Sequence, residues 1–556
     1  MRELPFRKSH PKGLYTLFAT EMWERFSYYG MRALLTLYLT AELVNGGFGL
    51  DREAALEMYA IFTGLVYLTP ILGGWISDKY LGQRKTVYIG GLVMAVGQFL
   101  LAASALLYQS AESASDSRQF LFNFGLGVLI IGNGFFKPNI STVVGEFYND
   151  NDPMKDAAFN IFYLGINLGA ILGTFIAGGL GESVEWGYGF LAAGVGMILG
   201  ILWLKARENT LEYYGLPPNS PEGKQVLDGK DWSTIIIYVV GLILGTLLVI
   251  YIWGLLPDFI TNIITIGGFT AIILALSYVI IKGIEGEDTW RKKFYILTAV
   301  VALFLIVKYA GIWDMIAGSI QNYILYALVG AILVGLVLLL RSKSNDWSRM
   351  GVIIVLAIFN IVFWAGFEQA GGTFSLFAKE NTDRIMFGWE MPATWFQNVN
   401  SLAILIFASL FGLMWLWLDK KGWNPRTPVK FALGLFLGAL AFFVMTQASN
   451  AATGGHLVSP WWLVSVYILL TLGELMLSPI GLSMITKLAN PKLVSVVMGL
   501  WMASFAAGNY MAGMLESILH KYDFELYPFI TMVMLGSGVA LLLLSVLLNK
   551  AMKGIH

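Results

Sequence analysis

Long apolar runs recur along the whole chain. A helix needs about 20 apolar residues to cross the hydrocarbon core of a bilayer. Six runs of about this length lie within residues 14–205, four within residues 235–340 and six within residues 352–548. The pattern predicts an all-α integral membrane protein with an even number of crossings.

Composition narrows the class of protein. Hydrophobic residues make up 57% of the 556 residues and charged residues only 13%, whereas a soluble protein has about 25% charged residues. The formal net charge is zero, so a nucleic-acid partner is not indicated. The lack of cysteine excludes disulfides, thiolate metal sites and thiol catalysis. The four histidines fall in tails or predicted loops, so a proton carrier within the membrane must be a carboxylate.

Basic residues predict the orientation. They concentrate in alternate loops, for example Lys79 to Lys85 and Lys420 to Lys430, while the intervening loops contain few. Loops rich in Lys and Arg remain in the cytoplasm, which places both termini there. No cleavable signal peptide is evident, because the short basic tail leads into an apolar segment too long for one.

The two outer blocks are related by an internal repeat. A constant offset of 341 residues matches four features: Trp23 with Trp364, Asp78 with Asp419, Gly132 with Gly473, and Pro138 with Pro479. The repeat predicts an N-terminal six-helix bundle in residues 1–207 and a C-terminal six-helix bundle in residues 349–556. Residues 208–348 form a cytoplasmic linker and inserted transmembrane helices.

The first apolar run contains a stripe of charged and aromatic residues. On a helix, Glu21, Arg25, Tyr28 and Arg32 fall within about 60° of one another, and Glu24 lies about 60° to one side. Each such charge costs about 2.5–3.5 kcal/mol at the bilayer centre. Four of them facing lipid would cost roughly 10 kcal/mol, so the stripe must face a wet protein interior and is a candidate functional site.

Several motifs resemble those of known transporters. Residues 73–85 (GGWISDKYLGQRK) resemble the loop motif of the major facilitator superfamily, in which glycines permit close helix packing and charged residues latch the loop. The first-helix stripe, residues 21–30, is similar to a signature of the proton-dependent oligopeptide transporter family within that superfamily. Motifs at residues 132–139, 159–170, 363–369, 395–400 and 473–482 resemble this family's helices four, five, seven, eight and ten.

The resemblance implies a proton-coupled symporter that imports di- and tripeptides by alternating access. Peptide-like drugs are further candidate substrates, the proton is the coupling ion with no other cofactor, and the protein functions as a monomer. The expected location is the plasma membrane of a bacterium, which is the inner membrane if it is Gram-negative. The peptide-binding residues are expected to be Arg25, Tyr28, Tyr29, Arg32, Tyr67, Lys137, Asn167, Asn398, Glu474 and Trp501.

Cations suit the carboxylate of a zwitterionic peptide, and Glu474 suits its ammonium. Proton coupling is expected to involve Glu21, Glu24, Arg25 and Glu368, the last in an otherwise apolar seventh helix. By resemblance, Arg52 and Glu380 form an extracellular latch. Lys137 and Glu474 close the inner side when peptide is absent.

Two features depart from the family pattern. Four inserted helices are predicted where bacterial members usually have two, and Ser401 follows Asn400 where proline is common. A facilitator for nitrate or another small solute and a non-transporting receptor are alternative functions. A membrane enzyme is disfavoured, because no His or Cys falls within the predicted spans and no metalloprotease or serine hydrolase motif occurs.

Overall fold

A computed structural model describes most of the chain. The described residues are 9–108, 116–149, 152, 154–255, 333–386, 388–490 and 493–553, with short pieces between 270 and 299. Two of the four inserted helices predicted from the sequence, near residues 294–308 and 322–340, lie largely outside these ranges. The fold is all-α, as predicted, apart from one short hairpin.

The N-terminal part of the described chain folds into six spanning segments. The second segment comprises α2, α3 and the π-helical turn η2, and the fifth comprises α6, the π-helical turn η3 and α7. The bounds are α1 (Lys12–Thr40), η1 (Leu43–Asn45), α2 (Arg52–Leu68), α3 (Pro70–Ile76), η2 (Ser77–Leu81), α4 (Gln83–Leu106), α5 (Asp116–Glu146), α6 (Met154–Gly173), η3 (Thr174–Gly178), α7 (Gly179–Ser183), α8 (Trp186–Ala206) and η4 (Glu208–Leu211).

The C-terminal part repeats this plan in the described residues. Its first segment breaks at a 3-10 turn, η5, and an antiparallel hairpin precedes its second segment. The bounds are α14 (Asn345–Phe367), η5 (Glu368–Gly371), α15 (Thr373–Glu380), β1 (Ile385–Met386), β2 (Trp389–Glu390), η6 (Ala393–Gln397), α16 (Asn398–Lys420), α17 (Thr427–Ala451), α18 (Trp461–Leu488), α19 (Val494–His520) and α20 (Leu526–Ala551).

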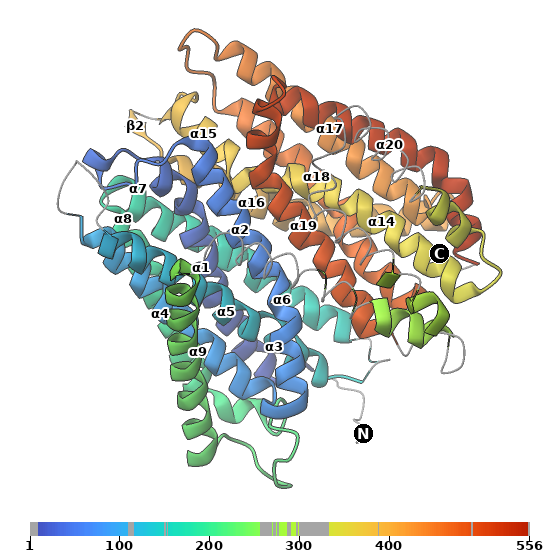
Figure 1. The fold of residues 1–556 in the computed structure, drawn as a ribbon, viewed down its shortest axis with the longest axis horizontal. Helices are drawn as coiled ribbons and strands as arrows, with labels where there is room; N and C mark the ends of the chain where they lie inside the picture. The colour runs from blue at the N-terminus through green and yellow to red at the C-terminus, as the bar shows by residue number, and fades with distance from the viewer. Residues whose placement is uncertain are drawn as a thin grey trace.

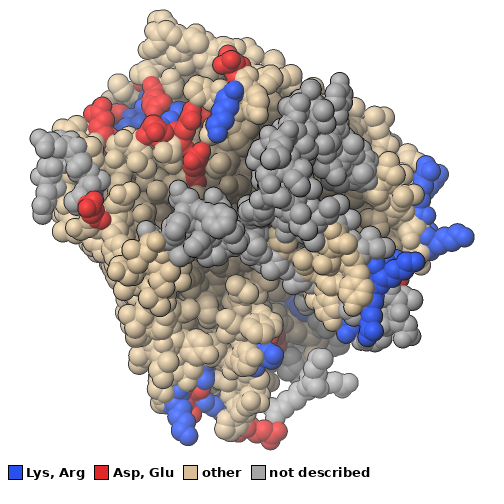
Figure 2. Space-filling view, in the orientation of Figure 1, with Lys and Arg blue, Asp and Glu red and all other residues tan. Residues whose placement is uncertain are grey.

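The helices form two bundles that lie side by side (Figure 1). In the first bundle, α1 packs on α6 and α8, and α4 packs on α5; in the second, α17 packs on α18 and α20, and α14 packs on α19. Eleven helical segments of the described residues are long and apolar enough to cross a membrane. Figure 2 shows charged side chains gathered toward opposite ends of the molecule with a broad uncharged band between them. The chain is therefore a multi-pass membrane protein.

Contacts between the bundles follow the internal repeat. The main ones join α2 to α19 and α6 to α16. The offset of 341 residues takes the start of α2, Arg52, to Ala393 at the start of η6, which leads into α16; it takes α6 onto α19. The repeat thus exchanges the two contacts, and the interface has the pseudo-twofold symmetry that parallel repeats produce.

Glycines set the depth at which α6 packs against the charged stripe of α1. A Cβ atom on Gly169 would lie 2.2 Å from the backbone oxygen of Met22, and one on Gly173 would lie 2.2 Å from that of Phe26. No side chain fits at such distances, so the two backbones are in contact over the stripe. This close packing shields the charged residues of α1 from lipid.

The linker after the first bundle is fastened to the face that holds the chain termini, here called the terminal side. Arg84 is 2% exposed, and its guanidinium donates to the backbone oxygens of Tyr214, at 2.6 Å, and of Gln225 and Glu212. Lys85 pairs with Asp231 at 2.8 Å. Arg84 and Lys85 of the residue 73–85 motif therefore hold the linker onto this face. Helix α9 (Gly229–Leu255) then leaves it and packs on α4 and α5.

Candidate transport site

The charged stripe of α1 is buried between helices. Glu21 is 3% exposed, Glu24 is 0%, Arg25 is 2% and Arg32 is 7%. Their burial keeps these side chains away from lipid, as predicted from the sequence. They form two clusters, one around Arg25 and one around Arg32.

The first cluster joins the two carboxylates of α1 through Arg25. The Arg25 Nε atom lies 3.1 Å from Glu21 Oε1, and it also donates to Glu24. Asn133 on α5 approaches Glu24 Oε1 at 3.4 Å. Glu21 Oε2 and Arg25 Nη2 are buried and have no hydrogen-bond partner among the residues that the structure describes. Unsatisfied buried polar atoms are uncommon and costly, so this cluster retains capacity to bind a polar ligand.

Lys137 and Tyr67 lie beside this first cluster. The Lys137 ammonium is 4.1 Å from the centre of the Tyr67 ring, and that ring stacks on Phe505 of the second bundle. Lys137 makes no ion pair within the described part of the chain, although Arg25, Glu24 and Glu368 are within electrostatic reach of it. Its positive charge is thus available to an anionic group.

The second cluster connects the two bundles. Arg32 pairs with Glu368, which is 2% exposed, and its Nε atom donates to the Tyr59 hydroxyl at 2.8 Å. Thr36 donates to the backbone oxygen of Gly371 at 2.8 Å. A Cβ atom on Gly371 would lie 2.0 Å from the Tyr59 oxygen, so only glycine permits this approach. The break in the helix at η5 presents Glu368 to the first bundle.

Residues of the second bundle complete the central region. Glu474 on α18 accepts a hydrogen bond from Asn400 at 3.1 Å, and Asn400 also donates to Thr471 at 2.9 Å. Trp501 is fully buried against Phe431 and Phe505, and its indole nitrogen has no hydrogen-bond partner in the described ranges.

The two asparagines expected to bind peptide are also buried. Asn167 donates to the backbone oxygen of Tyr163 at 3.0 Å, and the buried amide oxygen of Asn398 has no partner among the described side chains and backbone. Asn400 belongs to the same motif as Asn398 but was not among the predicted binding residues. Its position between Thr471 and Glu474 reveals its role as the partner of that carboxylate.

Tyr29 lies where both bundles meet. Its ring is 6.0 Å from the Arg25 guanidinium and 5.7 Å from that of Arg32, and it packs edge-on against Tyr28 at 5.3 Å. The charges of Glu368 and Glu474 also reach it. The stripe of α1 and the two carboxylates of the second bundle therefore surround one central region.

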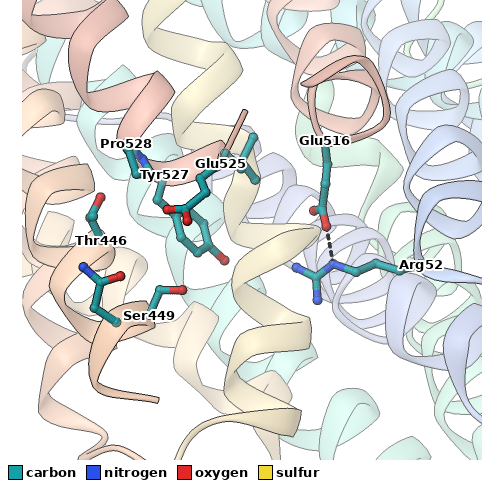
Figure 3. Close-up of a pocket in the computed structure, with 9 residues that line it drawn as sticks. Arg52, Thr446, Ser449, Glu516, Glu525, Tyr527 and Pro528 are labelled. Atoms are coloured by element: carbon teal, nitrogen blue, oxygen red, sulfur yellow. Dashed lines mark hydrogen bonds and ion pairs between the residues drawn. The ribbon is translucent and has the colours of Figure 1, made fainter. Parts of the chain in front are cut away.

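The side opposite the chain termini, here called the opposite side, contains the Arg52 pair expected from the sequence. Arg52 Nη1 lies 3.3 Å from Glu380 Oε2, and its Nε atom lies 2.5 Å from Glu516, a partner that the sequence did not indicate (Figure 3). A cavity of about 210 Å³ lies next to this pair and is lined by Thr446, Ser449, Glu525 and Tyr527, among others. In contrast, Lys137 and Glu474 form no ion pair with each other in the described residues.

Comparison with known proteins agrees with this architecture. The POT family model matches residues 84–213 and 271–532. The peptide transporter YePEPT of Yersinia enterocolitica is 33% identical, over 93% of this chain and 90% of that protein. The di-/tripeptide transporter of Lactococcus lactis subsp. cremoris is 30% identical, over 96% and 94%.

A solved structure is similar over nearly the whole length. The crystal structure of a peptide transporter POT in complex with sulfate superposes with a TM-score of 0.69 and 31% identity, over 99% of this chain and 98% of that one. The matched proteins are transporters and not enzymes. The chain belongs to the POT family of transporters.

Proposed function

We propose that this protein is a proton-coupled symporter that imports di- and tripeptides by alternating access. Relatives over almost the full chain are named as peptide and di-/tripeptide transporters. We further propose that it acts as a monomer in a bacterial plasma membrane, with both termini in the cytoplasm. Figure 2, drawn in the orientation of Figure 1, shows Lys and Arg side chains on the face that holds the chain termini. The positive-inside rule places such a face in the cytoplasm.

The central region suits a zwitterion. Within the described part of the chain, Arg25 Nη2 has no hydrogen-bond partner and Lys137 has no ion pair, so both can bind a carboxylate at one end of a peptide. Glu474, held by Asn400, can accept the ammonium at the other end. The aromatic rings of Tyr28, Tyr67 and Trp501 supply apolar surface between them. Binding both ends of a peptide through fixed charges leaves its side chains free to vary.

One observation carries the proton coupling. Among the described residues, the central region holds four buried carboxylates, those of Glu21, Glu24, Glu368 and Glu474, but only three cations, those of Arg25, Arg32 and Lys137. With every group ionised, one negative charge is unbalanced, which is costly in a buried site. A zwitterion does not change this sum, whereas one proton neutralises it. The charge balance therefore favours one extra proton in the site, and the symport proposed here requires such a proton site.

The Arg32–Glu368 pair supplies the link between protonation and movement. It joins α1 of the first bundle to η5 of the second. A proton on Glu368 removes its charge, and among the described residues Arg32 then keeps its hydrogen bond to Tyr59 and its contact with the Tyr29 ring. Loss of the pair lets the bundles separate, so the protonated and unprotonated proteins favour different arrangements.

Uptake in proteoliposomes tests the proposal. Purified protein should accumulate dipeptide when an inward proton gradient is imposed and should equilibrate it without accumulation when the gradient is collapsed. A panel of competing peptides with blocked amino or carboxyl termini should compete poorly, because each lacks one of the two charges. A lack of uptake for every di- and tripeptide, with nitrate or another small solute transported instead, would contradict the proposal.

A further inference from the structure

Glu182, at the end of α7 in the first bundle, is bound to the second bundle by four groups. It accepts hydrogen bonds from the backbone N–H groups of Ala393, at 2.9 Å, and Thr394, at 3.1 Å. Arg384 approaches the same carboxylate at 3.3 Å and Lys379 at 3.5 Å. Figure 1 places α7 and the hairpin strand β2 at the same edge of the molecule. No sequence motif singled out this residue.

The Glu182 carboxylate and the Arg384 side chain are buried, although Lys379 is 45% exposed. The Glu182 side chain is 4% exposed and that of Arg384 is 8% exposed. Nearby, the rings of Phe175 and Trp395 stack across the two bundles with their centres 4.0 Å apart, and the Trp395 indole donates to the Phe175 backbone oxygen at 3.2 Å. The contact is thus a packed seam that contains a buried charge.

The internal repeat relates this seam to the Arg52 pair. The offset of 341 residues matches Arg52 with Ala393, whose N–H group donates to Glu182. The same offset matches Phe175 with Glu516, which pairs with Arg52. The two contacts therefore occupy equivalent places at the two ends of the bundle interface on the opposite side. A transporter that opens this side must separate both.

We propose that Glu182 is the principal latch of the opposite side, which faces outward in the proposed orientation and is called the outer side from here on. The Arg52–Glu380 pair is then the weaker of two latches on this side. This proposal rests on the alternating-access function proposed above. The physical reason is the difference in burial. The Arg52 and Glu380 side chains are 35% and 53% exposed, and water and salt weaken exposed pairs. Glu182 is shielded, and its release leaves two backbone donors of η6 to be resolvated.

The latch also acts on a structural element and not only on another side chain. Ala393 and Thr394 begin η6, which continues directly into α16, so the carboxylate satisfies N–H groups that the first turn of a helix leaves free. Holding this end fixes the α16 segment against α7. Breaking the contact frees the whole segment to tilt.

Distances between spin labels test the proposal directly. The native chain has no cysteine, so labels can be placed at Val44 and Leu457 alone. These residues are 61% and 59% exposed and lie on the outer side of different bundles. Pulsed electron paramagnetic resonance of the full chain in lipid nanodiscs then reports how much of the protein has an open outer side, with no substrate required.

The expected result is a shift to longer distances in Glu182→Gln. An amide offers one acceptor oxygen in place of two, so the outward-open fraction should rise at least tenfold relative to the parent. Glu380→Gln should raise it less than fivefold. Glu185→Gln, which changes an exposed carboxylate three residues away, is the matched control and should leave the distances unchanged.

A second variant, Arg384→Gln, tests the proposal if Glu182→Gln does not fold. Arg384→Gln keeps Glu182 and its backbone donors and should shift the distances in the same direction by a smaller amount. Unchanged distances in Glu182→Gln, or a larger shift in Glu380→Gln, would overturn the proposal. If Glu182→Gln fails to fold, unchanged distances in Arg384→Gln would do the same. Failure of the proposed function would appear separately, as a lack of peptide uptake by the parent protein.

Discussion

Replacing Glu368 with glutamine is the sharpest mutational test of proton coupling. The carboxylate is 2% exposed and pairs with Arg32, which is 7% exposed. Removing one partner of a buried ion pair costs about 3–5 kcal/mol. Because Arg32 keeps its hydrogen bond to Tyr59 and an amide can still accept one from it, we expect the lower end of this range.

A loss of about 3 kcal/mol corresponds to a shift of about 10²-fold in the equilibrium between the paired and separated arrangements. The amide also imitates a permanently protonated carboxyl group. Glu368→Gln should therefore accumulate dipeptide under an inward proton gradient at no more than about 1% of the parent rate. Exchange of labelled for unlabelled peptide across the membrane requires no net proton movement, so it should persist.

The assay compares gradient-driven uptake with counterflow in the same proteoliposomes. Glu380→Gln is a suitable comparator because that side chain is 53% exposed, and its loss should cost at most about 1 kcal/mol. Gradient-driven uptake by Glu368→Gln within threefold of the parent rate would show that Arg32–Glu368 is not the coupling pair. Loss of counterflow as well as driven uptake would indicate damage to the peptide site.

Three further predictions concern neighbouring parts of the structure. Arg25→Ala should raise the peptide Kd at least tenfold as well as abolish coupling, and unchanged affinity in a titration would remove Arg25 from the carboxylate site. Asn400→Leu should weaken binding of peptides with a free amino terminus more than binding of amino-blocked ones, because Glu474 loses its described partner; an equal effect on both would count against that role. Arg84→Ala should lower the Tm by several degrees and expose residues 212–225 to protease, because three backbone oxygens lose their donor; unaltered protease resistance would show that the linker is held otherwise.

Features determined within one helix could be predicted from the sequence. The stripe from Glu21 to Arg32 follows from helical periodicity and from the cost of charges in lipid, and the structure buries all four charges. The paired bundles followed from hydropathy and the internal repeat. The Arg52–Glu380 pair, expected from the resemblance, is 3.3 Å apart in the structure.

Contacts between distant residues could not be predicted in the same way. Arg32 and Glu368 are separated by 336 positions, and their meeting depends on how the two bundles dock and on the break at η5. Glu182 binds backbone N–H groups, which have no signature in the sequence. Glu516 is a second partner of Arg52 because α2 packs against α19, and this packing could not be predicted from the sequence.

In the proposed symport, peptide and proton enter together. The most direct measurement follows labelled dipeptide and luminal pH simultaneously in proteoliposomes that contain a trapped pH indicator. Adding dipeptide should acidify the lumen as uptake proceeds, and Glu368→Gln should abolish both signals. Peptide accumulation without luminal acidification, or acidification that is indifferent to peptide, would contradict it.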